Sequence, residues 1–103
     1  MAHESTRVIE ISADHPAFTG HFPGKPIVPG VVLLDRVLAA VAEDPALAGR
    51  DVQIRAAKFL APVGPGARLD LRLAIDARGG LNFEFSQAGS IVASGSLSFS
   101  PTP

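Results

Sequence analysis

The chain has 103 residues, a formal net charge of −1 and no cysteine. This length predicts one compact domain over residues 1–103, with residues 100–103 as a flexible tail. The near-neutral charge, without any run of basic residues, argues against a nucleic-acid partner, and the lack of cysteine excludes disulfides and thiolate chemistry.

The first residues do not resemble a targeting signal. Residues 1–7 contain no basic segment that leads into an apolar one. The longest apolar segment, residues 31–42, is interrupted by Asp35 and Arg36 and is too short to cross a bilayer. We therefore expect a cytoplasmic protein without a membrane partner, and a chain without cysteine suits that reducing compartment.

The N-terminal third contains a short expected strand, residues 7–12, followed by a stiffened loop. Residues 20–30 include three prolines and three glycines in eleven positions, which suits neither a helix nor the interior of a strand. Flexible linkers are polar, whereas this loop carries Phe22, Ile27 and Val28. The loop is therefore expected to pack against another part of the protein.

His21 stands near the start of this loop, where the backbone is constrained. Histidine has an unperturbed pKa of about 6.5, so it can act as a neutral base near pH 7. Two interpretations remain open from this residue alone. It is either a general base or a turn histidine that bonds to neighbouring backbone, and turn histidines are the commoner of the two.

One helix is expected over Gly30–Glu43, with Pro29 at its entry and Asp44 followed by Pro45 at its end. Its apolar residues leave almost no polar face: Val31, Val32, Leu33, Leu34, Val37, Leu38, Ala39, Ala40, Val41 and Ala42. Such a helix is buried on all sides, but a single sheet covers only one of them. No second helix of similar quality is expected, so a homodimer or higher homo-oligomer should cover the rest.

Asp35 lies in the middle of this apolar helix, where an unpaired buried charge would cost several kcal/mol. The residue is therefore expected to be functional, unless it pairs with Arg36 or lies on a solvated stripe. A rise of about 1.5 Å per residue places it about 7.5 Å along the axis from Gly30. The N–H groups of Gly30 and Val31 are unpaired donors at the positive helix end, where they suit a carbonyl oxygen that gains negative charge.

The C-terminal half alternates apolar and polar residues with a period of two, as in a sheet with one buried face. Four strands are expected, over residues 52–60, 68–76, 81–85 and 93–99. The pair Ala56 and Ala57 is a place where a bulge can reset the register. Turns at Gly79-Gly80 and at residues 88–90 connect the last three strands. The pattern predicts an α+β fold, an antiparallel sheet wrapped around one long central helix and closed by dimerisation.

Residues 20–35, GHFPGKPIVPGVVLLD, resemble the characteristic motif of β-hydroxyacyl-[acyl carrier protein] dehydratases of the FabZ/FabA type. Residues 58–66 resemble that family's second strand and its following turn. The resemblance implies a hot-dog fold and a dimer with two active sites at its interface. It also implies an acyl thioester substrate carried on the phosphopantetheine of acyl carrier protein or coenzyme A.

By position in this motif, His21 matches the family's catalytic histidine and Asp35 its catalytic acid, and each site takes the two residues from different subunits. Gly30 matches the glycine whose N–H binds the thioester oxygen. The neighbouring Phe22, Pro29 and Val31 are expected to bind substrate. Aspartate at the acid position matches the branch with members that also isomerise the double bond, and Arg36 replaces a residue that is commonly small.

Three functions remain open at this point. The first is dehydration of (3R)-3-hydroxyacyl thioesters to trans-2-enoyl thioesters in fatty-acid or related acyl-chain biosynthesis, which needs no cofactor. The second is a hot-dog thioesterase in which Asp35 activates water, although His21 would then have no task. The third is a non-catalytic acyl-binding or scaffold module, which would need neither acid nor base. No metal site is expected, because His3, His15 and His21 lack a suitable spacing.

Overall fold

The computed structural model describes residues 4–12, 28–47 and 49–99. The described elements follow the order β1 (Glu4–Glu10), α1 (Gly30–Glu43), β2 (Val52–Phe59), β3 (Arg68–Ile75), β4 (Leu81–Gln87) and β5 (Ser90–Phe99). The expected helix is confirmed, with the bounds that the sequence predicted.

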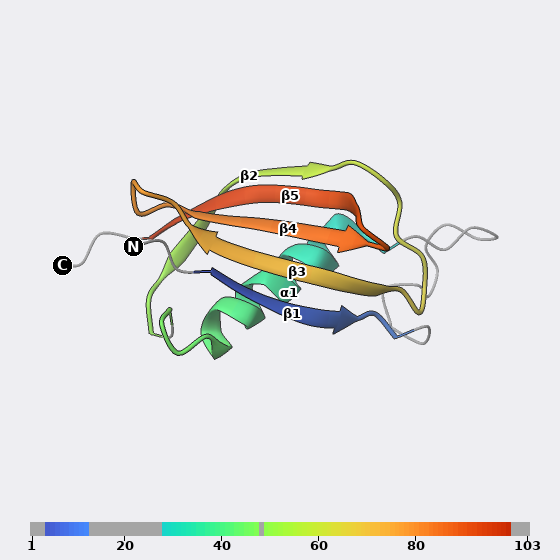
Figure 1. Ribbon diagram of the computed structural model, residues 1–103, viewed down its shortest axis with the longest axis horizontal. Coiled ribbons are helices and arrows are strands. Elements are labelled where there is room, and N and C mark those ends of the chain that lie inside the picture. The colour runs from blue at the N-terminus through green and yellow to red at the C-terminus, as the bar shows by residue number, and fades with distance from the viewer. Residues whose placement is uncertain (1–3, 13–27, 48, 100–103) are drawn as a thin grey trace.

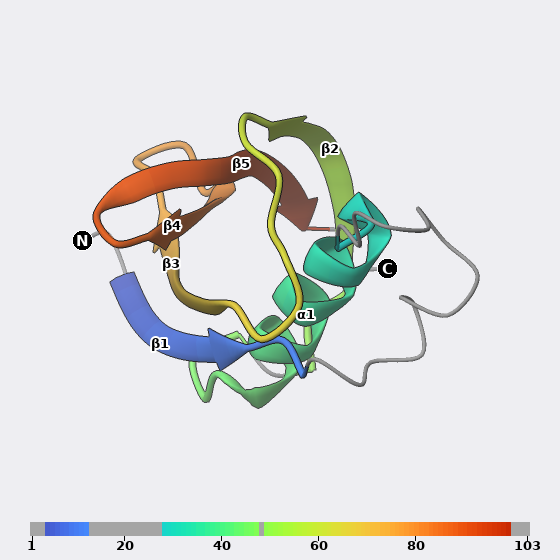
Figure 2. The same cartoon turned by 90° about the vertical axis from the view of Figure 1, so that its right-hand side faces the viewer.

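The strands form one antiparallel sheet in the order β1-β3-β4-β5-β2. The meander β3-β4-β5 makes its centre, while β1 and β2, which flank α1 in the sequence, make its two edges. The sheet lies over α1 and curls around it (Figures 1 and 2). The expected α+β fold, with a sheet wrapped around a single long helix, is confirmed.

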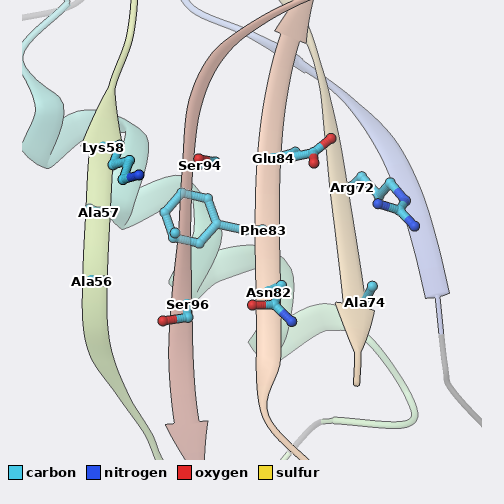
Figure 3. A pocket seen from close by; sticks show the side chains of 11 residues that line it. Ala56, Ala57, Lys58, Arg72, Ala74, Asn82, Phe83, Glu84, Ser94 and Ser96 are labelled. Atoms are coloured by element: carbon cyan, nitrogen blue, oxygen red, sulfur yellow. The ribbon is translucent and has the colours of Figure 1, made fainter. Parts of the chain in front are cut away.

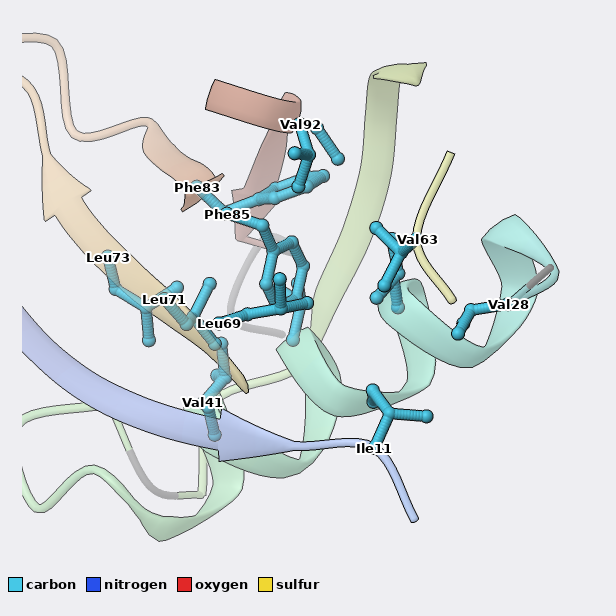
Figure 4. Close-up of a cluster of buried hydrophobic side chains, with 14 of the residues drawn as sticks. Ile11, Val28, Val41, Val63, Leu69, Leu71, Leu73, Phe83, Phe85 and Val92 are labelled. Atoms are coloured by element: carbon cyan, nitrogen blue, oxygen red, sulfur yellow. The ribbon is translucent and has the colours of Figure 1, made fainter. Parts of the chain in front are cut away.

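The core lies between the concave face of the sheet and α1 (Figure 4). Alternate residues of the strands point into it, while Arg68, Asp70 and Arg72 between them are exposed, as the period of two predicted. The rings of Phe83 and Phe85 meet edge to face at a centroid distance of 6.1 Å. The side chains buried from these elements are Leu33, Val37, Ala40, Val41, Leu69, Leu71, Leu73, Leu81, Phe83, Phe85, Val92, Ala93 and Leu97.

The end of α1 is anchored to the first strand. The N–H of Asp44 donates to the carbonyl of Ala40 at 3.0 Å, which closes the last helical turn. The buried carboxylate of Asp44 accepts hydrogen bonds from the Ser5 hydroxyl and from the N–H of Ala46, both at 3.0 Å. The predicted helix end is therefore confirmed, and it also holds β1 against the helix.

The first strand starts earlier than expected. The sequence predicted residues 7–12, but the ladder with β3 runs from Glu4 to Glu10. Arg72 donates two hydrogen bonds to the Glu4 carboxylate, at 2.8 and 2.9 Å. The strand therefore begins at a polar residue, where the sequence shows no apolar residue to predict a strand. At the other end, Ile11 leaves the ladder and bonds to the loop before β3, through the carbonyl of Ala67 at 2.9 Å.

The bulge in β2 falls one position before the expected pair of alanines. The register with β5 shifts between Ile54 and Ala56. The shift brings the carbonyl of Ala56 close to Gly95, where a Cβ atom would overlap that oxygen and lie 2.5 Å from the Phe83 ring. Only glycine fits at this crossing of β2, β5 and the core.

The two hairpin turns also differ from expectation. β3 ends at Ile75 and β4 starts at Leu81, so the first turn spans residues 76–80 and not only the two glycines. The second turn consists of residues 88 and 89, because Ser90, expected in the turn, pairs with Gln87 as the first residue of β5.

Candidate active site

The described part of the predicted site lies in the first two turns of α1. Pro29 precedes the helix, Gly30 and Val31 open it, and Asp35 follows one and a half turns later. Two of the predicted residues, His21 and Phe22, lie outside the described residues.

The loop between β2 and β3 holds the start of α1 in place. The N–H of Val28 donates to the carbonyl of Val63 at 2.7 Å, and both side chains are buried. Figure 4 shows the two side chains beside the first turns of the helix, and Figure 2 shows the loop running from β2 past the helix to β3. The backbone just before Gly30 is therefore fixed by packing as well as by the proline at position 29.

The first turn of α1 presents unpaired backbone donors. Pro29 is extended, with φ −60° and ψ 144°, and provides no side-chain cap. The N–H of Val32 donates to the Pro29 carbonyl at 2.9 Å, but within the described residues no acceptor bonds the N–H groups of Gly30 and Val31. No acidic side chain lies in this turn. The positive end of the helix therefore suits an oxygen that carries negative charge.

Asp35 is exposed in the single chain, so it is not an unpaired buried charge there. Among the described residues no ion pair joins it to Arg36, and the alternative of a solvated stripe describes its surroundings. Five residues of helix rotate it by about 140° from Gly30, away from the sheet. Asp35 and Arg36 line an open hollow of about 400 Å³ together with Val31 and Val32.

The helix surface beside Asp35 is apolar and uncovered. The exposed fraction is 70% for Val31 and 37% for Leu38. The sheet covers the opposite side of the helix, where Leu33, Val37 and Ala40 are buried. This asymmetry supports the expectation that a second subunit covers the helix, and it puts Asp35 on the side where that subunit would lie.

A second, smaller hollow lies on the other side of the helix start. Its volume is about 220 Å³, and its lining consists of Val28, Gly30, Leu33, Phe59, Leu60, Ala61, Pro62 and Val63. The ring of Phe59 lies so close to Gly30 that a Cβ on that glycine would come within 2.6 Å of the ring atom Cζ. The sequence analysis missed Phe59 as a site residue, although it belongs to the 58–66 segment that resembles the dehydratases.

A third hollow, of about 320 Å³, lies on the outer face of the sheet and is separate from the helix start. Figure 3 shows its polar side chains in a row across the strands, with Lys58, Ser94, Glu84 and Arg72 on successive strands. These side chains lie on the face opposite the core, so they do not belong to the predicted site.

The described residues contain no group of three or more histidine, cysteine or acidic side chains that could hold a metal ion. In the same part of the chain, no helix combines the length and the apolar character needed to span a bilayer.

In the part of the chain that the structure describes, the sheet curved over one long helix and the proline-glycine entry to that helix fit the hot-dog class of dehydratases. The family described as ApeI-like, ApeI dehydratase, matches residues 2–96, and the chain belongs to this family. The expected resemblance to hydroxyacyl dehydratases is therefore confirmed, and the protein is a dehydratase-like lyase with a role in hydroxyacyl dehydration.

Among curated relatives, the 3-hydroxyacyl-[acyl-carrier-protein] dehydratase FabZ of Chlamydia trachomatis serovar L2 is 39% identical over 105 residues. That match covers 86% of this chain and 67% of the relative. FabZ of Haemophilus influenzae strain PittEE is 34% identical over 76 residues, which cover 63% of this chain and 49% of the relative.

Two solved structures have the same fold and a sequence identity above 25% to this chain. The dehydratase heterocomplex ApeI:P from Xenorhabdus doucetiae has a TM-score of 0.81 and 27% identity, over 96% of this chain and 88% of that one. An uncharacterized protein from Erwinia carotovora subsp. atroseptica has a TM-score of 0.83 and 29% identity, over 97% and 85% of the two chains.

Proposed function

We propose that the protein removes water from (3R)-3-hydroxyacyl thioesters and yields trans-2-enoyl thioesters, with the acyl chain carried on the phosphopantetheine of an acyl carrier protein. The observation that carries this proposal is the start of α1 in a chain that belongs to a dehydratase family. There the N–H groups of Gly30 and Val31 find no acceptor among the described residues, and they lie about one and a half turns from Asp35. The FabZ relatives, whose name specifies substrates on acyl carrier protein, support the choice of carrier.

In the proposed reaction His21 removes the proton from the α-carbon of the substrate. The electrons of that bond form the double bond as the β-hydroxyl leaves, and Asp35, directly or through a bound water, protonates the departing oxygen to give water. Negative charge builds on the thioester oxygen during the transfer. The N–H of Gly30 and the positive end of α1 stabilise this charge, and the reaction needs no cofactor.

The proposed working unit is a homodimer of single-domain chains in the cytoplasm, with two shared sites. The uncovered face of α1 around Val31 and Leu38 supports a second subunit on the side that carries Asp35. In this arrangement Asp35 serves the His21 of the partner chain. Arg36 is exposed next to Asp35, where a cation suits the phosphate of a phosphopantetheine arm or an acidic carrier surface.

The test is an assay with 3-hydroxyacyl pantetheine thioesters of graded chain length, in which enoyl product and free thiol are followed separately. We expect enoyl product without thiol release. His21→Ala should lower the rate by at least roughly a hundredfold while the protein stays folded, because a general base has been lost.

His15→Ala is the matched control, since it removes another histidine from the N-terminal third of the sequence and should keep the wild-type rate. Thiol release without enoyl product would instead identify a thioesterase, and binding without either product would identify an acyl-binding module. Near-normal dehydration by His21→Ala would remove that residue from the mechanism.

A further inference from the structure

Phe59 is the last residue of β2 and half of its side chain is exposed. The tip of its ring lies against Gly30, where a Cβ would come within 2.6 to 3.0 Å of three ring atoms. Only the hydrogen of glycine leaves room for the ring at this place. The contact joins the edge strand directly to the first turn of α1, whose N–H groups at Gly30 and Val31 have no acceptor within the described part of the chain.

The backbone around Phe59 is fixed, whereas its side chain is only half-buried. Phe59 pairs with Ala93 in the ladder, and the following N–H of Leu60 donates to the carbonyl of Val92 at 2.8 Å. The side chain extends from this support with two torsion angles and only partial burial. Core packing therefore does not account for an aromatic residue here, because a half-exposed ring gains little of the stabilisation that full burial gives.

The hollow that Phe59 borders is apolar. Val28, Leu33 and Val63 are buried at its walls, and its remaining side chains are Leu60, Ala61 and Pro62. Its volume of about 220 Å³ is far more than the space that one water molecule needs. A hollow of this size and lining suits a short hydrocarbon segment, and its Gly30 end meets the donors that suit a thioester oxygen.

We infer that Phe59 determines the acyl-chain selectivity of the enzyme. This inference rests on the proposed function, because it takes the acyl chain of the thioester as the occupant of the hollow. The ring of Phe59 closes the hollow beside Gly30 and so limits the length of chain that fits behind the thioester carbonyl. Removal of the ring lengthens the apolar space without touching the backbone donors.

The experiment compares wild-type protein with Phe59→Ala on 3-hydroxybutanoyl and 3-hydroxydecanoyl pantetheine. We expect the ratio of kcat/KM for the long over the short substrate to rise about tenfold, the effect of burying about two further methylene groups. The same rise is expected in the ratio of association constants, 1/Kd, of decanoyl over butanoyl pantetheine, measured by calorimetry. Neither ligand has a hydroxyl to eliminate, so this measurement reports binding alone.

Val8→Ala is the matched control, because Val8 is an apolar strand residue of similar exposure, 47% against 50%, on the opposite edge strand. It should leave both ratios unchanged. Phe59→Leu should raise them by about threefold, because leucine is shorter than the ring and frees room for about one methylene group. This variant replaces Phe59→Ala if the latter does not fold.

Ratios within twofold of wild type for the folded Phe59 variants would overturn the inference. The two proposals fail in different ways. Loss of the proposed function appears as absent dehydration by wild type, while a shifted Kd ratio would still support the role of Phe59. A wild-type protein that binds neither acyl pantetheine would refute the role of Phe59 as well.

Discussion

At the scale of single residues, Asp76 organises the turn between β3 and β4. Its carboxylate accepts hydrogen bonds from the N–H groups of Gly80 and Arg78, both at 2.9 Å, and from the Asn82 amide at 3.3 Å. These bonds favour the ionised form, so they lower the pKa of Asp76, with the bond from Gly80 as the largest cause and that from Arg78 next.

This lowered pKa predicts how the stability of the protein depends on pH. A carboxyl whose pKa is lower in the folded state contributes stability above its ordinary pKa and loses it as the pH falls through the folded value. Asp76→Asn, which mimics the protonated form, should therefore be less stable than wild type at about pH 7, and this deficit should be smaller at about pH 3, below the ordinary pKa of the carboxyl. Urea midpoints at the two pH values measure the difference.

Asp70→Asn on the exposed face of β3 is the control, and its urea midpoint should stay near that of wild type. A deficit for Asp76→Asn that is the same at both pH values would show that the charge of the carboxylate does not stabilise the turn.

The sequence alone located part of the candidate site. Pro29, Gly30 and Val31 lie at the helix start as predicted, because a proline-glycine entry is a local signal. The exposure of Asp35 was only one of the alternatives that the sequence left open, since the apolar composition of α1 does not tell which side the chain's own sheet covers. The contact of Phe59 with Gly30 was also missed, because it depends on how β2 and the following loop pack on the helix.

At the scale of elements, the periodicity of apolar residues predicted those helices and strands that have one face in the core. β3 and β4 follow a strict alternation that the buried face imposes, and α1 was predicted with its correct bounds. The prediction of β1 failed at its start, where pairing with β3 and the ion pair of Glu4 replace apolar burial. Turn lengths were also wrong, because they are set by strand register, which the residue pattern alone does not fix.

The turn between β4 and β5 is strained at one position. Ala88 has φ 51°, in the left-handed region that alanine disfavours, and Gly89 follows with φ 85°. Two positive values match the type I′ hairpin turn, for which asparagine before glycine is preferred. Ala88→Asn should therefore stabilise the protein by about 0.5–1 kcal/mol, measured as the free energy of unfolding in urea.

Ala77→Asn, in the other hairpin turn, is the matched control because Ala88 is the sole non-glycine residue with positive φ in the described part of the chain. This control should not gain stability. A loss of stability in Ala88→Asn would mean that the contacts of the side chain at this position, and not its backbone angle, determine which residue is the more stable one there.

At the scale of the whole molecule, the proposed dimer gives a countable result. If each site combines His21 of one chain with Asp35 of the other, a hybrid of His21→Ala and Asp35→Asn chains has one site with both changes and one with neither. Random pairing of equal amounts makes about half of the dimers hybrids, so about a quarter of the sites become intact. We expect dehydration to reappear near that fraction when the two inactive variants are refolded together.

Each variant refolded alone provides the baseline, and hybrid formation is verified by mass spectrometry of differently tagged chains. Verified hybrids without recovered activity would mean that both residues act within one chain or that one of them is misassigned.

The strand order also determines when the protein can fold during its synthesis. α1 leaves the ribosome before any residue of β3, β4 and β5, the strands that form the centre of the sheet over it. Even the first strand lacks its partner at that time, since Glu4 pairs with Ala74. The apolar helix therefore stays uncovered until the last third of the chain has emerged, so a nascent chain of this kind depends on rapid completion, or on a chaperone, to avoid aggregation.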